Sequence, residues 1–121
     1  MRALAALLAL SALAAGPAGA QAAAETGTGA VLRALDRMSG TYRDITVPTS
    51  ATASFGRIEI DHAECRYPAG NPAGDAYALL RVRDTVAGTV PFTGWMIASA
   101  PALNALDHPR YDVWLLRCTT S

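Results

Sequence analysis

Short segments of alternating apolar and polar residues, separated by turns that contain glycine or proline, constrain the fold of this chain most strongly. In 55–60, Ile58 and Ile60 fall on one face and charged residues fall on the other. This period of two is typical of β-strands that bury one side. Further strands are expected at 41–47, 76–83, 90–98 and 111–118. The last of these is the most apolar and is therefore expected at the centre of a sheet.

One short helical turn is expected near 99–107, between the last two strands. Ser99 is a suitable N-cap, and Leu103 and Leu106 are expected to face the core from this turn. The chain shows no alternation of strands with long helices. With six or seven strands, we expect a mainly β fold, a small single-domain sandwich or an open barrel at 30–121.

The first segment of the domain, 30–38, allows two interpretations. Its apolar residues lie at helical spacing, and the residue propensities favour a helix. The Ser39-Gly40 pair would end such a helix, but it also suits the two-residue turn of a hairpin with 41–47. The residues alone leave helix and strand open for this segment.

The first twenty residues have the three parts of a secretory signal. Arg2 precedes an apolar run at 3–15, and small residues offer a cleavage site near Ala20. The apolar run is shorter than the ~20 residues that a membrane-spanning helix needs. A flexible leader is expected at 21–29, because alanine, threonine and glycine dominate it. We therefore expect a periplasmic domain with no transmembrane segment after signal removal.

The charge of the chain excludes some classes of partner. Ten basic and ten acidic residues give a formal net charge of zero. This balance provides no electrostatic reason to expect binding to nucleic acid or to an anionic membrane surface.

The chain contains two cysteines, Cys65 and Cys118. In an oxidising compartment this even number suggests one structural disulfide, worth roughly 4 kcal/mol on the chain-entropy model. A bulge near 61–63 would turn Cys65 towards the core. Free thiols or a metal pair are the alternatives, but with His62 and His108 the spacing is unlike that of a compact zinc site. No metal ligand and no cofactor are predicted.

The run 92–118, FTGWMIASAPALNALDHPRYDVWLLRC, resembles a family of uncharacterised exported proteins found mostly in alphaproteobacteria. Blocks at 32–40, 55–60 and 65–66 also fit, so the resemblance covers about 30–119. It implies a single-domain periplasmic protein with two matching cysteines and without an assigned catalytic residue or ligand. Relatives carry more β-branched residues at 32–40, which favours the hairpin for this segment.

Four residues near the C-terminus are of the types that a hydrolase active site uses. Ser99 and His108, with Asp107 or Asp112, include a nucleophile, a base and an orienting acid. The residues beside Ser99 lack the glycines of a nucleophile elbow. Each residue also has a structural explanation, such as Ser99 capping the turn and Asp107 accepting backbone N–H groups. We therefore predict no catalytic residue.

Asp112 shares a predicted strand face with Trp114 and Cys118. If that face is buried, an isolated carboxylate is costly and needs an ionic or hydrogen-bond partner. Arg66 and Arg110 are the expected partners.

Two aromatic residues are candidates for partner contacts. Core packing is one expectation for Trp95, but its phase is opposite to that of its apolar neighbours, and the alternative is an exposed side chain that anchors a partner. Tyr77 lies on a predicted strand face with arginines and extends this mixed surface. Together with His108 and Asp112, these residues form the candidate interface or cleft. Trp114 is expected in the core.

We expect a non-catalytic periplasmic domain that binds an envelope protein, as an accessory component of an envelope or inner-membrane assembly. The first alternative is a small-molecule or glycan binding module with a cleft near Trp95 and His108. The second is a small hydrolase that uses Ser99 and His108.

Overall fold

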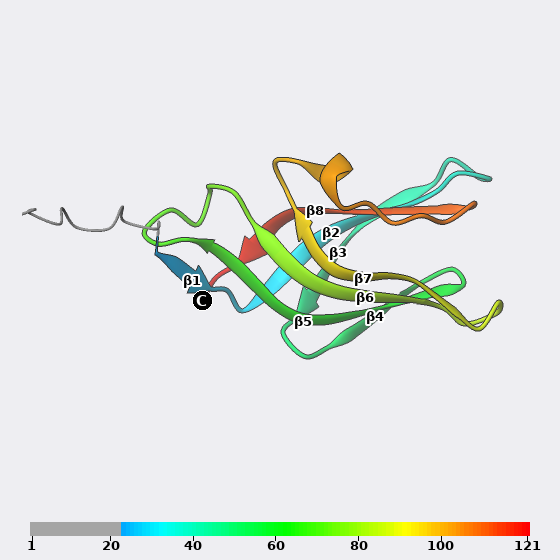
Figure 1. Cartoon of the computed structure of the whole chain (residues 1–121), viewed down its shortest axis with the longest axis horizontal. Helices are drawn as coiled ribbons and strands as arrows, with labels where there is room; N and C mark the ends of the chain where they lie inside the picture. The colour runs from blue at the N-terminus through cyan, green and yellow to red at the C-terminus, as the bar shows by residue number, and fades with distance from the viewer. Residues whose placement is uncertain (1–22) are drawn as a thin grey trace, which may run out of the picture.

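The computed structural model describes residues 23–121, so the predicted signal at 1–20 lies outside the described residues. Eight strands and one 3₁₀ turn make up the described chain (Figure 1). They are β1 (Ala24–Thr26), β2 (Gly29–Asp36), β3 (Tyr42–Pro48), β4 (Thr52–Phe55), β5 (Ile58–Pro68), β6 (Tyr77–Asp84), β7 (Thr89–Ile97), η1 (Pro101–Leu103) and β8 (Tyr111–Thr119). No helix of this part is long and apolar enough to cross a bilayer.

The strands form two antiparallel sheets. The large sheet has the order β1-β5-β6-β7, with β4 also paired to β5, and the small sheet has the order β3-β2-β8. The sheets lie close together near the C-terminus, and their hairpin tips separate towards the opposite end (Figure 1). This two-layer, almost helix-free architecture confirms the predicted mainly β single domain.

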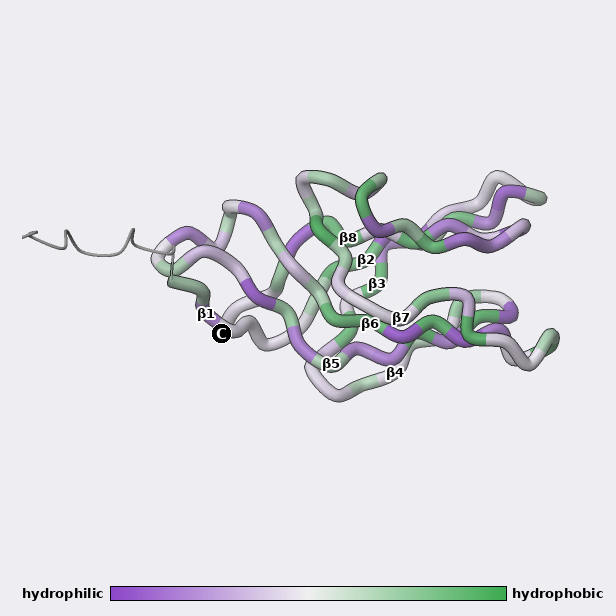
Figure 2. The backbone as a smooth tube through the Cα atoms, viewed as in Figure 1, coloured by the Kyte–Doolittle hydropathy of each residue, from purple (hydrophilic) through white to green (hydrophobic). Residues whose placement is uncertain are grey.

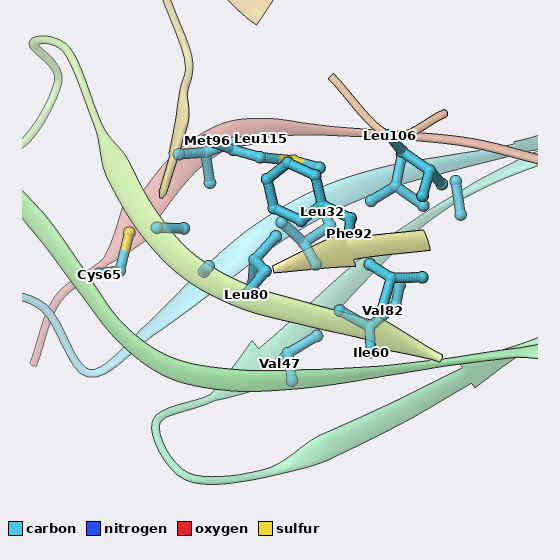
Figure 3. Close-up of a cluster of buried hydrophobic side chains, with 14 of the residues drawn as sticks. Leu32, Val47, Ile60, Cys65, Leu80, Val82, Phe92, Met96, Leu106 and Leu115 are labelled. Carbon is cyan, nitrogen blue, oxygen red and sulfur yellow. The ribbon is translucent and has the colours of Figure 1, made fainter. Parts of the chain in front are cut away.

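The core lies between the two sheets and comes from the inward face of each strand. Leu32, Ile60 and Leu80 are essentially inaccessible to solvent, and Figure 3 shows them pointing towards one another from β2, β5 and β6. In Figure 2, hydrophobic stretches gather in the middle of the molecule and hydrophilic stretches lie along the hairpins. For β6 and the first half of β5, alternation in the sequence therefore identifies the buried face.

Residues 30–36 of the segment 30–38 belong to the strand β2, as the hairpin interpretation predicted, and residues 37–38 lie in the turn that follows. This strand pairs with β3 up to Leu35 and Tyr42, and the loop between the strands has five residues rather than two. The carboxylate of Asp36 accepts the backbone N–H of Met38, and the backbone oxygen of Asp36 accepts the N–H of Gly40. Gly40 has a φ of 72°, a conformation that favours glycine, and this closes the wider turn.

Two segments expected to be irregular are strands. Residues 24–26, within the expected flexible leader, form β1 and pair with the end of β5. Residues 52–55, expected as loop and strand start, form β4, which joins β5 through a turn at Gly56. Gly56 has a φ of 54°, and a Cβ there would collide with the Tyr111 hydroxyl. The sequence did not indicate this turn, because apolar and polar residues keep alternating through 55–60 as they would in one continuous strand.

The two cysteines are bonded across the sheets. The register of β5 and β6 shifts between His62 and Glu64, where the bulge was expected, and Cys65 turns inward. Cys65 and Cys118 form a disulfide with an S–S distance of 2.03 Å. This bond joins β5 of the large sheet to β8 of the small sheet.

The last strand differs from expectation, because β8 lies at an edge of the small sheet and not at a sheet centre. Its edge position is compatible with its apolar sequence because Val113 and Leu115 are 3% and 2% exposed. The connection 98–110, from β7 to β8, passes beside it and contributes the buried Leu106. Leu103 on this connection is 76% exposed, so its predicted core position was wrong.

Candidate functional site

The four candidate residues do not converge on one site. Trp95 and Tyr77 lie on the outer face of the large sheet, whereas His108 lies between the ends of the two sheets. Asp112 lies on the outer face of the small sheet. The structure therefore separates them into one surface pair and two single positions.

Trp95 and Tyr77 form an exposed aromatic patch with Leu79, named here the outer patch. Trp95 lies directly opposite Leu79, and Tyr77 lies two residues before Leu79 on the same face of β6. Trp95 is 36% exposed and Tyr77 is 37% exposed. The negative charge of Asp75 raises the pKa of the Tyr77 phenol.

The backbone at Trp95 is held by the connection between β7 and β8. The side-chain amide of Asn104 donates to the Trp95 carbonyl oxygen at 2.7 Å. A Cβ on Gly94, whose φ is 150°, would come within 3.1 Å of that same amide. Glycine here permits the close approach, and the edge carbonyl of β7 is satisfied.

His108 is buried and joins the two sheets. Its Nδ1 accepts the backbone N–H groups of Arg110 and Tyr111 at 3.0 and 3.1 Å. The ring proton must therefore lie on Nε2, which donates to the carboxylate of Asp84 at 2.8 Å. The backbone N–H of Ala87, followed by His108, lowers the pKa of Asp84 to about 2. All polar atoms of this imidazole are engaged in structural bonds.

Beside His108 and Asp84, an open hollow of about 510 Å³ lies between the separated ends of the two sheets. Met38 contributes to it from the β2–β3 hairpin, and Ala87 contributes from the β6–β7 hairpin. The Tyr111 hydroxyl accepts the backbone N–H of Arg57 at 3.1 Å and links the two sheets at its base. The hollow is of the size that small-molecule sites have.

The predicted partners of Asp112 were wrong. Its carboxylate lies 3.1 Å from Arg37, which also donates to the carbonyl oxygen of His108. Arg110 instead makes a two-pronged pair with Asp36, whose pKa falls to about 2 mainly through this bond. Arg66 lies near Glu64.

A register irregularity in the pairing of β2 with β8 explains why the face of Asp112 was misjudged. The register shifts so that Val31 pairs with Arg117 and Leu32 pairs with Leu115. Leu115 and Cys118 can therefore both be buried, and Asp112 points outward. Trp114 shares this outward phase, so its predicted core position was also wrong.

The residues of the hydrolase hypothesis are not assembled. The Ser99 hydroxyl donates to Asp75 at 2.6 Å, just before β6, whereas His108 binds Asp84 at the end of β6. A strand of this length separates them by roughly 25 Å. Ser99 is also not the N-cap of η1, because Ala100 occupies that position and makes no side-chain hydrogen bond.

The sequence did not indicate that one buried side chain has a nitrogen atom without a hydrogen-bond partner in the described part of the chain. His62 is 1% exposed, and its Nδ1 lies 3.2 Å from the Pro48 carbonyl oxygen. Its Nε2 has no hydrogen-bond partner among residues 23–121. The same residues contain no cluster of three or more His, Cys, Asp or Glu that could hold a metal ion.

Comparison with known proteins identifies bacterial relatives. Residues 30–118 match the family model DUF2155, described as an uncharacterized protein conserved in bacteria. An uncharacterized protein of Rickettsia prowazekii (strain Madrid E) is 26% identical over 88 residues, which cover 70% of this chain and 57% of that protein. The chain thus spans a little over half the length of this curated relative. No solved structure matches the chain.

Proposed function

The chain belongs to the bacterial family DUF2155, and from this premise we propose that it is a non-catalytic periplasmic domain that binds a protein partner. The charged start, apolar run and small residues within 1–20 support export. The Cys65–Cys118 disulfide supports an oxidising compartment. In this proposal the domain is an accessory component of an envelope or inner-membrane assembly.

The observation that carries the proposal is the outer patch. Trp95 and Tyr77 flank the half-buried Leu79 on the exposed face of the large sheet, and Arg81 follows on the same face. Tryptophan, tyrosine and arginine are the residues that most often dominate the binding energy of protein interfaces. Paired strands hold the backbone beneath these side chains, so little backbone entropy is lost when a partner covers them.

Affinity capture with matched variants tests the proposed surface. A tagged protein is crosslinked in the producing cell, and the captured proteins are compared between wild type, Trp95→Ala with Tyr77→Ala, and Val90→Ala. Val90 is the control because it lies on the same strand as Trp95 and is 44% exposed. We expect one recurrent envelope protein whose capture falls at least about tenfold in the double variant only. Equal capture by all three proteins would exclude the outer patch.

The periplasmic location has a separate test. Osmotic shock should release the processed protein, with Gln21 at or near its N-terminus, together with a periplasmic marker. Retention with a cytoplasmic marker would contradict the location but would leave the outer patch untested.

The hollow near His108 favours a second candidate function, binding of a small apolar molecule. Its size and its position between the sheets support this function. It replaces the expected cleft near Trp95 and His108, because Trp95 lies on the outer face of the large sheet. Native mass spectrometry should then detect a retained small molecule that an Ala87→Trp variant lacks. A mass equal to that of the bare chain in both proteins would exclude this function.

A further inference from the structure

The outer face of the small sheet carries a second aromatic site that the core and the outer patch do not use. Tyr42 on β3 is 65% exposed, and Trp114 on β8 is half-buried. Leu35 and Arg33 lie between them on β2. These four side chains line an open hollow of about 250 Å³, named here the aromatic groove.

The strand register defines the width of the aromatic groove. Leu35 lies opposite Tyr42, and Arg33 lies opposite Trp114. The two aromatic residues therefore stand on the two outer strands of the sheet, about 12 Å apart on a diagonal across β2. This spacing accommodates a single extended chain between two rings, over the apolar floor that Leu35 provides.

Hydrogen-bond donors predominate on the rim of the groove. The Tyr42 hydroxyl and the Trp114 indole N–H have no hydrogen-bond partner within residues 23–121. The Arg33 guanidinium donates to both oxygens of Asp44, at 2.8 and 3.0 Å, and lies 5.3 Å from the centre of the Tyr42 ring. The nearest carboxylate is thus engaged, and hydrogen-bond acceptors of a ligand would find donors at this rim.

Charge adds a second condition on the ligand. Arg33 is paired with Asp44, and Arg37 is paired with Asp112. Arg117 has no salt bridge within the described chain, and its charge helps to lower the pKa of Asp44 after the larger effect of Arg33. The face therefore has one uncompensated positive charge and favours a neutral or acidic ligand over a basic one.

We propose that the aromatic groove binds a proline-rich segment of another protein, with neutral or acidic flanking residues. A polyproline II segment has no internal hydrogen bonds, so its carbonyl oxygens are free to accept from Tyr42 and Trp114. Its proline rings are apolar and present no N–H group that would need an acceptor. Aromatic-lined grooves recognise such segments because little conformational entropy is lost on binding. The site is independent of the outer patch and goes beyond the proposed function.

Direct titration of the full exported domain with synthetic peptides tests the groove. The probes are a decaproline peptide flanked by aspartates, the same peptide flanked by lysines, and a glycine–serine peptide of equal length flanked by aspartates. We expect saturable binding of the first, at least about fivefold weaker binding of the second, and no saturation with the third. No saturation with any probe, or tighter binding of the lysine-flanked peptide, would overturn the proposal.

Matched variants locate the binding. Tyr42→Ala and Trp114→Ala should each weaken binding of the aspartate-flanked peptide at least about tenfold, while Trp95→Ala should leave it unchanged. Tyr42 is exposed, so its variant keeps the test decisive even if Trp114→Ala fails to fold. Unchanged binding by Tyr42→Ala, or equal loss in Trp95→Ala, would overturn the assignment. Since partner capture depends on Trp95 and peptide binding on Tyr42, failure of one proposal is distinguishable from failure of the other.

Discussion

At the scale of single residues, the most informative side chains are polar groups buried where the two sheets begin to separate. Asp84 accepts two backbone N–H groups of its own hairpin and the Nε2–H of His108. The sequence placed His108 in a turn before a proline but contained no signal for a partner 24 residues earlier. Only the pairing of strands brings such residues together, so the sequence could suggest the residue types but not their contacts.

The low pKa of Asp84 predicts a defined dependence of stability on pH. The carboxyl has a pKa of about 2 in the folded protein, below its ordinary value of 3.8, so it stabilises the fold above pH ~4. That stabilisation should decline as the pH falls from about 4 towards 2. Urea denaturation across this range should show a smaller decline in Asp84→Asn than in wild type. An identical decline in the two proteins would contradict this role, because Asp36 would then account for the titration.

The Tyr111 hydroxyl predicts a local loss of stability. Tyr111→Phe removes the acceptor of the Arg57 backbone N–H and should lower the free energy of unfolding by about 1 kcal/mol. Tyr42→Phe is the matched control, because the exposed Tyr42 hydroxyl lacks a hydrogen-bond partner in the described chain. Chemical denaturation of both variants checks this. Equal effects would show that the hydroxyl of Tyr111 contributes nothing specific.

At the scale of elements, alternation in the sequence predicts most strands but misjudges their ends and neighbours. The bulge that turns Cys65 inward was predictable, because Cys65 is out of phase with Ile58 and Ile60. The irregularity before Leu115 was not, and it reversed the expected face of Asp112 and Trp114. An apolar strand sequence also indicates that the strand is buried, but it does not indicate which part of the chain covers it. For β8 that part includes the connection 98–110, which covers an edge.

The disulfide between β5 and β8 predicts a large change in stability. It links residues 53 apart in sequence, and on the chain-entropy model its removal costs about 4 kcal/mol. Replacing both cysteines with alanine should therefore lower the free energy of unfolding by roughly that amount. Adding a reductant to the wild type should lower stability in the same direction. Unchanged stability would show that packing of β5 against β8 is sufficient without the bond.

At the scale of the whole molecule, the two-layer fold produces two outward faces with different chemistry. The outer patch combines Trp95 and Tyr77, and the phase of Trp95 in its strand indicates an exposed side chain as the alternative to core packing. The aromatic groove combines Tyr42 and Trp114, and neither its existence nor its width follows from the sequence. Its residues come from three strands whose order depends on the packing of the whole sheet. The proposed activities of the domain accordingly lie on its surfaces, while the buried polar groups hold the sheets together.

Site-specific photocrosslinking tests the proposed partner binding most directly. A photoreactive amino acid replaces Tyr77 in one protein and Val90 in another, and both proteins are illuminated in the intact producing cell. We expect a discrete adduct with one envelope protein from position 77 and none from position 90. Absence of an adduct at position 77, or the same adduct from both positions, would contradict a protein partner on the outer patch.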